Sequence, residues 1–288
     1  MKAVEIVTHR LLHLTDTHVV PEGELLHGGV DSLDNLRRAL ATVEAGTDLP
    51  DAIVLTGDLT DTGDPRAYRR LKAVVEESAA RMGAEVVYVM GNHDARPGFW
   101  AELVGDPTAD QLSYDVVREV GGLRVISLDS TVPGHHHGEL TAEQLHWLAD
   151  VLAQPAPAGT VIGLHHAPVP APSELGAFLG LRDPQGFWDV VAGSDVRLVL
   201  AGHTHAASAT TVDGVLVWTG GAIAYAMDAT APAGMLRGRF GPVYSRVDVF
   251  GESVAAHHVR LPAADEGVVY EVPLEQLQAA IAAQAGAH

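Results

Sequence analysis

Short apolar runs alternate with amphipathic segments over the first two hundred residues of the chain. Six of these runs have the length and composition of buried strands. Between the first two, the segment 33–43 repeats leucine or valine at helical spacing, and Ser32 is placed to cap that helix. The alternation predicts an α/β layered fold with largely parallel central strands. The predicted strands are Leu11–Leu14, Ala52–Leu55, Val86–Met90, Leu123–Leu128, Thr160–Leu164 and Arg197–Ala201.

Two further helices carry start signals. Pro65 stands at the expected first turn of a helix that runs past Val75. Thr141 and Gln144 have the spacing of a capping box, and Leu140 with Leu145 has that of a hydrophobic staple. We therefore expect each helix to begin at these positions.

The character of the chain changes after about residue 210. Strand-like runs then follow one another without a long helix between them, and the Gly/Pro/Arg-rich segment 229–242 is predicted to be a loop. We expect one domain over residues 1–262 and a C-terminal extension, 263–288, that is helical from Pro273 to Ala285. The late strands are Val215–Thr219, Ser245–Phe250 and Ala255–Leu261.

Composition removes several classes of function. Among 288 residues, 18 basic and 37 acidic side chains give a net charge of −19, which argues against a protein that grips polymeric nucleic acid. No apolar run is long enough to span a membrane, and His9 and Arg10 interrupt the stretch a signal peptide needs, so we expect a cytoplasmic protein. The chain has no cysteine but 16 histidines, which raises the question of metal ligands.

Polar, metal-binding residue types follow five of the predicted strands. Because ligands bind outside the carboxyl ends of the strands in an open α/β sheet, these residues should converge in space. Each short motif alone is weak, since Gly-Asp and Gly-Asn-His are also common in turns. All five together, in this order and each after an apolar strand, are a strong signal. The motifs are Asp16-Thr17-His18, Gly57-Asp58, Gly91-Asn92-His93-Asp94, His165-His166 and Gly202-His203-Thr204-His205.

Two Asp, one Asn and four His among these motifs offer seven oxygen and nitrogen donors. Such a set suits Mn²⁺, iron, Co²⁺, Zn²⁺ or Ni²⁺ and does not favour Ca²⁺. One carboxylate can bridge two metals about 3.5–4 Å apart, the spacing of two-metal hydrolytic sites. Two dications against two carboxylates leave the site positive, so it should attract a small anion.

The motif set resembles that of the calcineurin-like metallophosphoesterases. The stretches TGDLTDTG, YVMGNHD, LDSTVPGHHHGEL, LHHAPVP and LAGHTH are similar, in order and spacing, to the bacterial class III cyclic-nucleotide phosphodiesterases. The likeness covers roughly residues 8–262 and implies a four-layer α/β/β/α sandwich, with a dimetal site at the C-terminal ends of the strands. A purple acid phosphatase would carry tyrosine at the position of Asp61, and a protein Ser/Thr phosphatase would have Glu at that of Asp94. Neither subclass fits.

The resemblance also implies a role for each site residue. The first metal would be held by Asp16, His18 and His205, the second by Asn92, His165 and His203, with Asp58 bridging the two. A bridging hydroxide would attack phosphorus. His93 would contact the phosphate as a catalytic residue, and Asp94 would either orient it or serve as a turn residue.

Other polar residues have weaker claims. The tract His135–His137 is more simply a polar loop, although the resemblance keeps His136 as a substrate contact beside Asn92 and His93. His166 is expected to stabilise its loop, and Asp61 to lie just behind the ligands. Arg66, Arg69 and Arg70 are expected on a solvated helix face, and His257 and His258 at the surface or in packing roles.

The resemblance implies an enzyme that hydrolyses 3′,5′-cyclic nucleotides, cAMP first, to 5′-monophosphates with two Mn, Fe, Zn or Co ions. One alternative is a broad phosphodiesterase acting on 2′,3′-cyclic nucleotides, glycerophosphodiesters or envelope phosphodiesters, because one dimetal site accepts many diesters. Another is a metal-binding scaffold without activity, although all seven ligands and His93 are retained. The family resemblance implies a homodimer.

Overall fold

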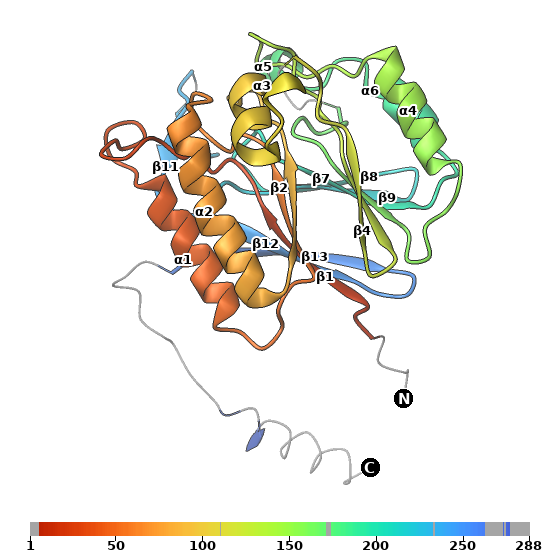
Figure 1. Ribbon diagram of the computed structural model, residues 1–288, viewed down its shortest axis with the longest axis horizontal. Coiled ribbons are helices and arrows are strands. Elements are labelled where there is room, and N and C mark those ends of the chain that lie inside the picture. Colours follow the sequence, from red (N-terminus) through yellow and green to blue (C-terminus); the bar gives the residue numbers. More distant parts are fainter. Residues whose placement is uncertain are drawn as a thin grey trace.

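The computed structural model describes residues 6–109, 111–170, 174–232 and 234–262, together with 273, 275 and 276. Two β-sheets stack face to face, with helices on the outer side of each (Figure 1). The central strands of the first sheet, β1 to β3, are parallel, and β12 joins antiparallel to β1. In order, this sheet contains β13 (Val254–Arg260), β12 (Val243–Val249), β1 (His9–Leu14), β2 (Ala52–Thr56) and β3 (Glu85–Val89).

The second sheet has four parallel strands with an antiparallel strand at each edge. Its order is β4 (Val116–Val120), β5 (Leu123–Ser127), β6 (Thr160–Gly163), β7 (Val196–Ala201), β9 (Val215–Thr219) and β8 (Ser208–Val212). A separate short ribbon pairs β10 (Ala226–Met227) with β11 (Gly238–Arg239).

The helices form the two outer layers. The first sheet is covered by α1 (Ser32–Glu44) and α2 (Pro65–Met82), and the second by α4 (Ala142–Leu152) and α6 (Pro184–Val191). The remaining helical elements are α3 (Arg96–Gly98), the π-helical η1 (Phe99–Val104), the 3₁₀ turn η2 (Pro107–Ala109) and α5 (Glu174–Leu179). No helix of the described residues is both long and apolar enough to cross a membrane.

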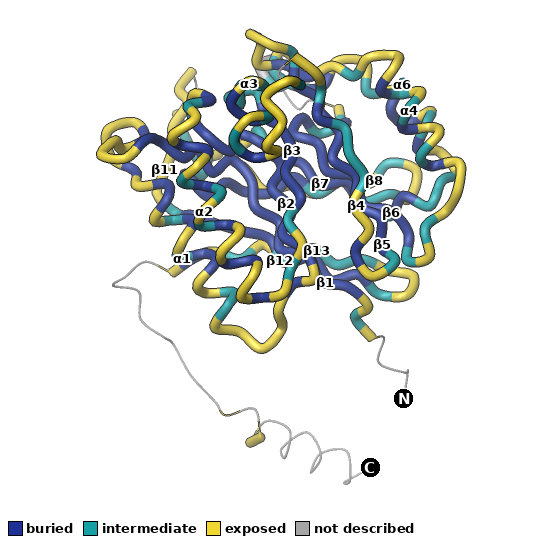
Figure 2. Tube along the Cα trace, viewed as in Figure 1, coloured by how far each residue is buried: buried dark blue, intermediate teal, exposed yellow. Residues whose placement is uncertain are grey.

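Three apolar layers hold the sandwich together. Between the sheets, Leu11, Val54 and Val87 pack in one cluster with Val125 and Val161. The outer clusters pack each helix pair onto its own sheet. Burial is accordingly concentrated in the strands, while the outer sides of the helices are exposed (Figure 2). The predicted four-layer sandwich is confirmed.

The structure corrects one predicted cap. Asp31, not Ser32, caps α1, because its carboxylate accepts a hydrogen bond from the amide of Asp34. Ser32 instead donates its hydroxyl hydrogen to the His18 carbonyl, 2.8 Å away. The capping box of Thr141 and Gln144 is present as predicted.

The remaining differences from the prediction lie at the edges of the fold. Strands β4 and β8 and helix α6 are not among the predicted elements. The predicted loop 229–242 includes β11 and is otherwise irregular within the described residues. The predicted helix Pro273–Ala285 falls almost entirely outside the described residues, so the division at residue 262 stays a prediction.

Candidate metal centre

The predicted ligands come together where the strands of both sheets end. They lie in the loops after β1, β2, β3, β6 and β7. The turns that aim them are tight: Asp16, His18, Asp58, His203 and His205 all have φ between 41° and 74°, in the left-handed region. Such backbone strain in residues other than glycine is typical of functional sites, where packing must hold it in place.

Glycines let these loops cross. A Cβ on Gly91 would lie 2.1 Å from the Asp58 amide nitrogen, and a Cβ on Gly202 would lie 1.9 Å from the Thr15 hydroxyl. Any side chain at either position would push a ligand loop away. Glycine is therefore required at both positions for the approach of the neighbouring loop.

The first group of donors is Asp16, His18 and His205. The Nδ1 of His205 donates to the Tyr225 carbonyl (3.0 Å), which fixes its tautomer and leaves a lone pair on Nε2. That Nε2 lies 3.3 Å from Asp16 Oδ1 and 3.2 Å from His18 Nε2. Asp61 lies behind His18, with Oδ1 3.2 Å from its Nδ1.

The second group is built in the same way. The Nδ1 of His165 donates to the Thr56 carbonyl (2.8 Å), so its Nε2 lone pair faces Asn92 Oδ1 at 3.2 Å and Asp58 Oδ2 at 3.4 Å. Asp58 Oδ2 also lies 3.6 Å from His18 Nε2, which places Asp58 between the two groups. The Nε2 of His203 is buried and has no hydrogen-bond partner.

These contacts fit two cations. Imidazole nitrogens and carboxylate or amide oxygens converge here within 3.2–3.6 Å of one another, and bound cations would satisfy these donor atoms in place of protons. Electrostatics agree. Burial opposes ionisation of Asp58, but the neighbouring His165 and His18 hold its pKa well below the usual value. Burial lowers the pKa of His203 to about 4, so this imidazole is neutral and able to bind metal.

Metal removal should make stability depend on pH in the alkaline range. Burial acts to lower the pKa of His165, but the negative charge and the hydrogen bond of Asp58 outweigh burial and raise this pKa from 6.5 to about 9. A pKa raised above 6.5 gives a stabilising contribution that is complete below pH 6.5 and is lost as pH rises through 9. In the metal-loaded protein a cation would take the place of that proton.

We therefore expect the chelator-treated protein to lose unfolding free energy between pH 6.5 and 9. The metal-reconstituted protein should lose much less. Denaturant titrations of both preparations at the two pH values measure this difference. Equal losses in both would contradict the assignment of His165 as a ligand.

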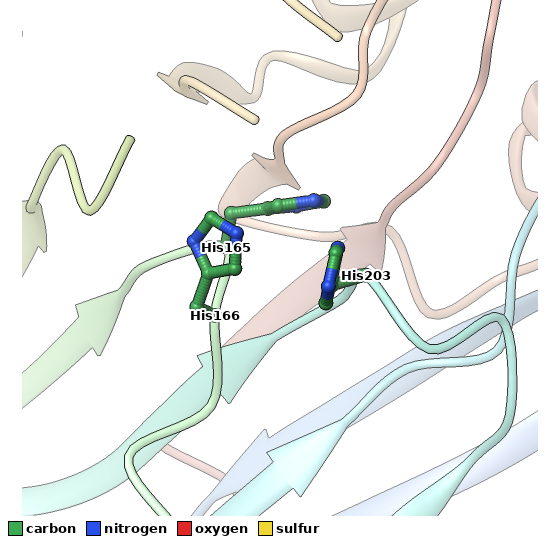
Figure 3. A group of neighbouring side chains, drawn as sticks. All are labelled: His165, His166 and His203. Atoms are coloured by element: carbon green, nitrogen blue, oxygen red, sulfur yellow. The ribbon is translucent and has the colours of Figure 1, made fainter. Parts of the chain in front are cut away.

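His166 lies beside the predicted ligands His165 and His203 (Figure 3), but its hydrogen bonds go to other residues. Its Nε2 donates to the His136 carbonyl (3.1 Å), so its Nδ1 accepts from the Ser130 hydroxyl (2.9 Å). No lone pair is left for a metal, although its ring lies 4.6 Å from that of His203. The contacts favour the predicted loop-stabilising role.

His93 borders the site without joining either donor group. Its Nδ1 donates to the Asp61 carbonyl (2.7 Å), its amide donates to Asp58 Oδ1 (2.8 Å), and its ring lies 4.7 Å from that of His18. The ring is one-third exposed, which leaves Nε2 available to a substrate. This geometry suits a residue that contacts the phosphate.

The hydrogen bonds of the Asp94 carboxylate go to residues other than the His93 ring. The carboxylate accepts hydrogen bonds from the amides of Leu59, Thr60 and Gly91 and from the Tyr68 hydroxyl. It therefore ties the loop after β3 to the loop after β2. Of the two roles expected for Asp94, these contacts favour the turn residue.

Asp94→Ala should consequently destabilise the fold by about 3 kcal/mol, because several backbone donors lose their acceptor. The free energy of unfolding from urea titration tests this. Asp64→Ala is the matched control. Asp64 caps α2 through the amide of Arg66 and also pairs with the exposed Arg66 guanidinium, so that change should cost about 1 kcal/mol. Equal effects of the two substitutions would contradict the structural role of Asp94.

The structure also locates the polar residues that the sequence analysis placed outside the metal-ligand set. His136 is exposed, and its Nδ1 lies 3.1 Å from Asn92 Nδ2, so it accepts from the amide whose oxygen faces the metal site. His257 pairs with Asp248 at the surface. The arginines of α2 contact Asp64, Glu102 and the Val20 carbonyl, as expected of a helix face.

Tyr225 was not predicted. Its ring lies 4.3 Å from His205 and 6.3 Å from His18, at the border of the metal centre. It follows no recognisable motif, and only the fold brings it to the site.

The fold and the site define a hydrolase with a dinuclear metal centre. The chain belongs to the calcineurin-like phosphoesterase family, whose model matches residues 9–207. It is 45% identical over 256 residues to a probable cyclic nucleotide phosphodiesterase of Rhodococcus erythropolis, covering 88% of this chain and 84% of the relative. It is 46% identical to a cAMP/cGMP dual specificity phosphodiesterase of Mycobacterium tuberculosis, covering 80% and 72%.

Solved structures support the fold. A dimetal phosphatase from Danio rerio superposes with a TM-score of 0.60 at 16% identity, covering 87% of this chain and 99% of that one. The family assignment makes this chain a metal-dependent phosphoesterase. The sequence prediction of the family is thereby confirmed.

Proposed function

We propose that the protein hydrolyses 3′,5′-cyclic nucleotides, cAMP first, to nucleoside 5′-monophosphates. The observation that carries the proposal is the pair of donor groups that share Asp58 between them, in a chain with high identity to cyclic nucleotide phosphodiesterases. Water adds to phosphorus, the bond to the 3′ oxygen breaks, and that oxygen takes a proton. The product is the 5′-monophosphate.

Each part of the site has a separate task in this proposal. Asp16, His18 and His205 would hold one metal, and Asn92, His165 and His203 the other, with Asp58 between them. When bound, the metals would neutralise the phosphate charge and lower the pKa of the attacking water. His93, fixed by the Asp61 carbonyl, would present Nε2 to the phosphate and supply the proton for the leaving oxygen.

The donor set supports Mn²⁺, Fe²⁺/Fe³⁺, Zn²⁺ or Co²⁺ as the ions, because it combines imidazole with hard oxygen donors. His136 would act on the substrate side by fixing the Asn92 amide. We also expect a cytoplasmic homodimer. Light scattering of the purified protein tests the oligomeric state.

The experiment is product analysis. Chelator-treated protein is reconstituted with Mn²⁺ and incubated with 3′,5′-cAMP, and the products are separated by chromatography. We expect 5′-AMP, no 3′-AMP, and no product with excess chelator or with Asp58→Asn. Mn²⁺-dependent hydrolysis of 2′,3′-cAMP or a glycerophosphodiester, with 3′,5′-cAMP left intact, would establish the alternative of a broad phosphodiesterase.

A further inference from the structure

A groove of about 520 Å³ lies beside the metal centre and is not used by the residues assigned above. One wall is the loop after β1, with His27. The other contains Leu236, from the segment between β10 and β11, Arg239 of β11, and Phe240, which directly follows β11. Tyr225 forms the end nearest the metals.

Tyr225 connects the groove to the metal centre. Its ring lies 4.3 Å from that of the ligand His205 and 5.3 Å from that of His27. It is held against the ribbon, because a Cβ on Gly238 would lie 2.8 Å from Tyr225 Cδ2. A ligand whose phosphate is bound by the metals would therefore meet Tyr225 first when it extends into the groove.

The lining suits a planar heterocycle. His27, Tyr225 and Phe240 offer aromatic faces, and the Phe240 side chain is not needed for the core, since the residue is 78% exposed. Bases stack on aromatic rings and on arginine guanidinium planes without requiring base-specific hydrogen bonds.

Charge in the groove also favours a nucleotide. Arg237 and Arg239 both donate from Nε to Asp228 Oδ2, each at 2.6 Å. Two guanidinium groups around one carboxylate leave a net positive charge at the wall. In a chain with a net charge of −19, such a wall attracts an anionic ligand.

We propose that this groove binds the nucleobase of the substrate, with Phe240 and Arg239 as its stacking surface. The base of a cyclic nucleotide is one sugar ring away from the phosphate, so it reaches past Tyr225 while the phosphate stays at the metals. The inference deepens the proposed function and rests on its nucleotide substrate. It places the contacts to the base on Tyr225, Arg239 and Phe240, outside the metal motifs.

The test separates the base from the phosphate. Two inhibitors, 5′-AMP and ribose 5-phosphate, are titrated against hydrolysis of bis(p-nitrophenyl) phosphate by the Mn²⁺-reconstituted protein. Wild type should bind 5′-AMP more tightly. Phe240→Ala should raise the inhibition constant of 5′-AMP about tenfold, the loss expected for one stacked base, and leave that of ribose 5-phosphate unchanged.

Arg239→Gln is a second, independent variant and should act in the same direction. Leu49→Ala is the matched control. Leu49 is also an exposed apolar residue, but it lies before the start of β2, whereas Asp58 follows the end of that strand. Neither inhibition constant should therefore change.

Equal binding of the two inhibitors by the wild type would overturn the proposal. Unchanged inhibition constants in Phe240→Ala would also overturn it. If that variant is a monomer where the wild type is a dimer, the groove contacts a second copy of the chain instead of a base. Failure of the proposed function looks different: 3′,5′-cAMP is not hydrolysed, whereas the comparison of the two inhibitors still shows whether a base binds here.

Discussion

Asn92→Ala is expected to lower kcat/KM by at least about 100-fold. Loss of a residue that only supports a metal ligand costs up to about 100-fold, and loss of a ligand should cost no less. Asn92 Oδ1 lies 3.2 Å from His165 Nε2, and its amide nitrogen donates to His136. Removing this oxygen takes away a neutral donor from the second group while Asp58 and His165 remain. The variant should therefore bind less metal at that position. Elemental analysis beside steady-state kinetics measures both effects.

The other asparagine of the sequence provides the control. Asn35 lies in α1 and donates to the carbonyls of Ile223 and Ala224, so Asn35→Ala changes the same residue type without touching the donor groups. Its metal content should equal that of wild type. Full metal content and unchanged turnover in Asn92→Ala would contradict the ligand assignment.

His93→Ala should reduce kcat by about 10²- to 10³-fold, the usual cost of one group that stabilises the transition state. Both metals should remain bound, because His93 borders the donor groups and its Nδ1 is engaged by the Asp61 carbonyl. The combination of full metal content and low kcat distinguishes this residue from the ligands.

His146→Ala controls for the loss of a histidine. Its side chain is 82% exposed on α4 and lies 3.8 Å from Asp150, so both metal content and kcat should be unchanged. A His93→Ala protein that loses one metal would show that His93 is a ligand, and the division of roles would be wrong.

The sequence predicted the centre of the fold better than its edges. Buried strands such as β2 and β6 are continuous apolar runs, and the layered architecture follows from their alternation with helices. The edge strand β8, whose sequence is SATTV, has little apolar character and exists because it pairs with β9. Its pairing is a tertiary contact, which a local pattern does not contain.

The same limit applies at the site. The seven predicted ligands could be found because each follows a strand, and the carboxyl ends of parallel strands meet. Tyr225 has no such position, and the hydrogen bonds of Asp94 connect three separate segments of the chain. Ser32 and Asp31 are adjacent and both are good caps, so the choice between them depended on the tertiary contact of Ser32 with His18.

The most direct test of the account is the ratio of kcat/KM for 3′,5′-cAMP to that for 2′,3′-cAMP, measured on chelator-treated protein reconstituted with Mn²⁺. A synthetic aryl diester and a monoester complete the panel. The account predicts that 3′,5′-cAMP gives the highest kcat/KM and that all activity disappears with the metal. A value for 3′,5′-cAMP that is orders of magnitude below those for the 2′,3′-cyclic and aryl diesters would contradict it.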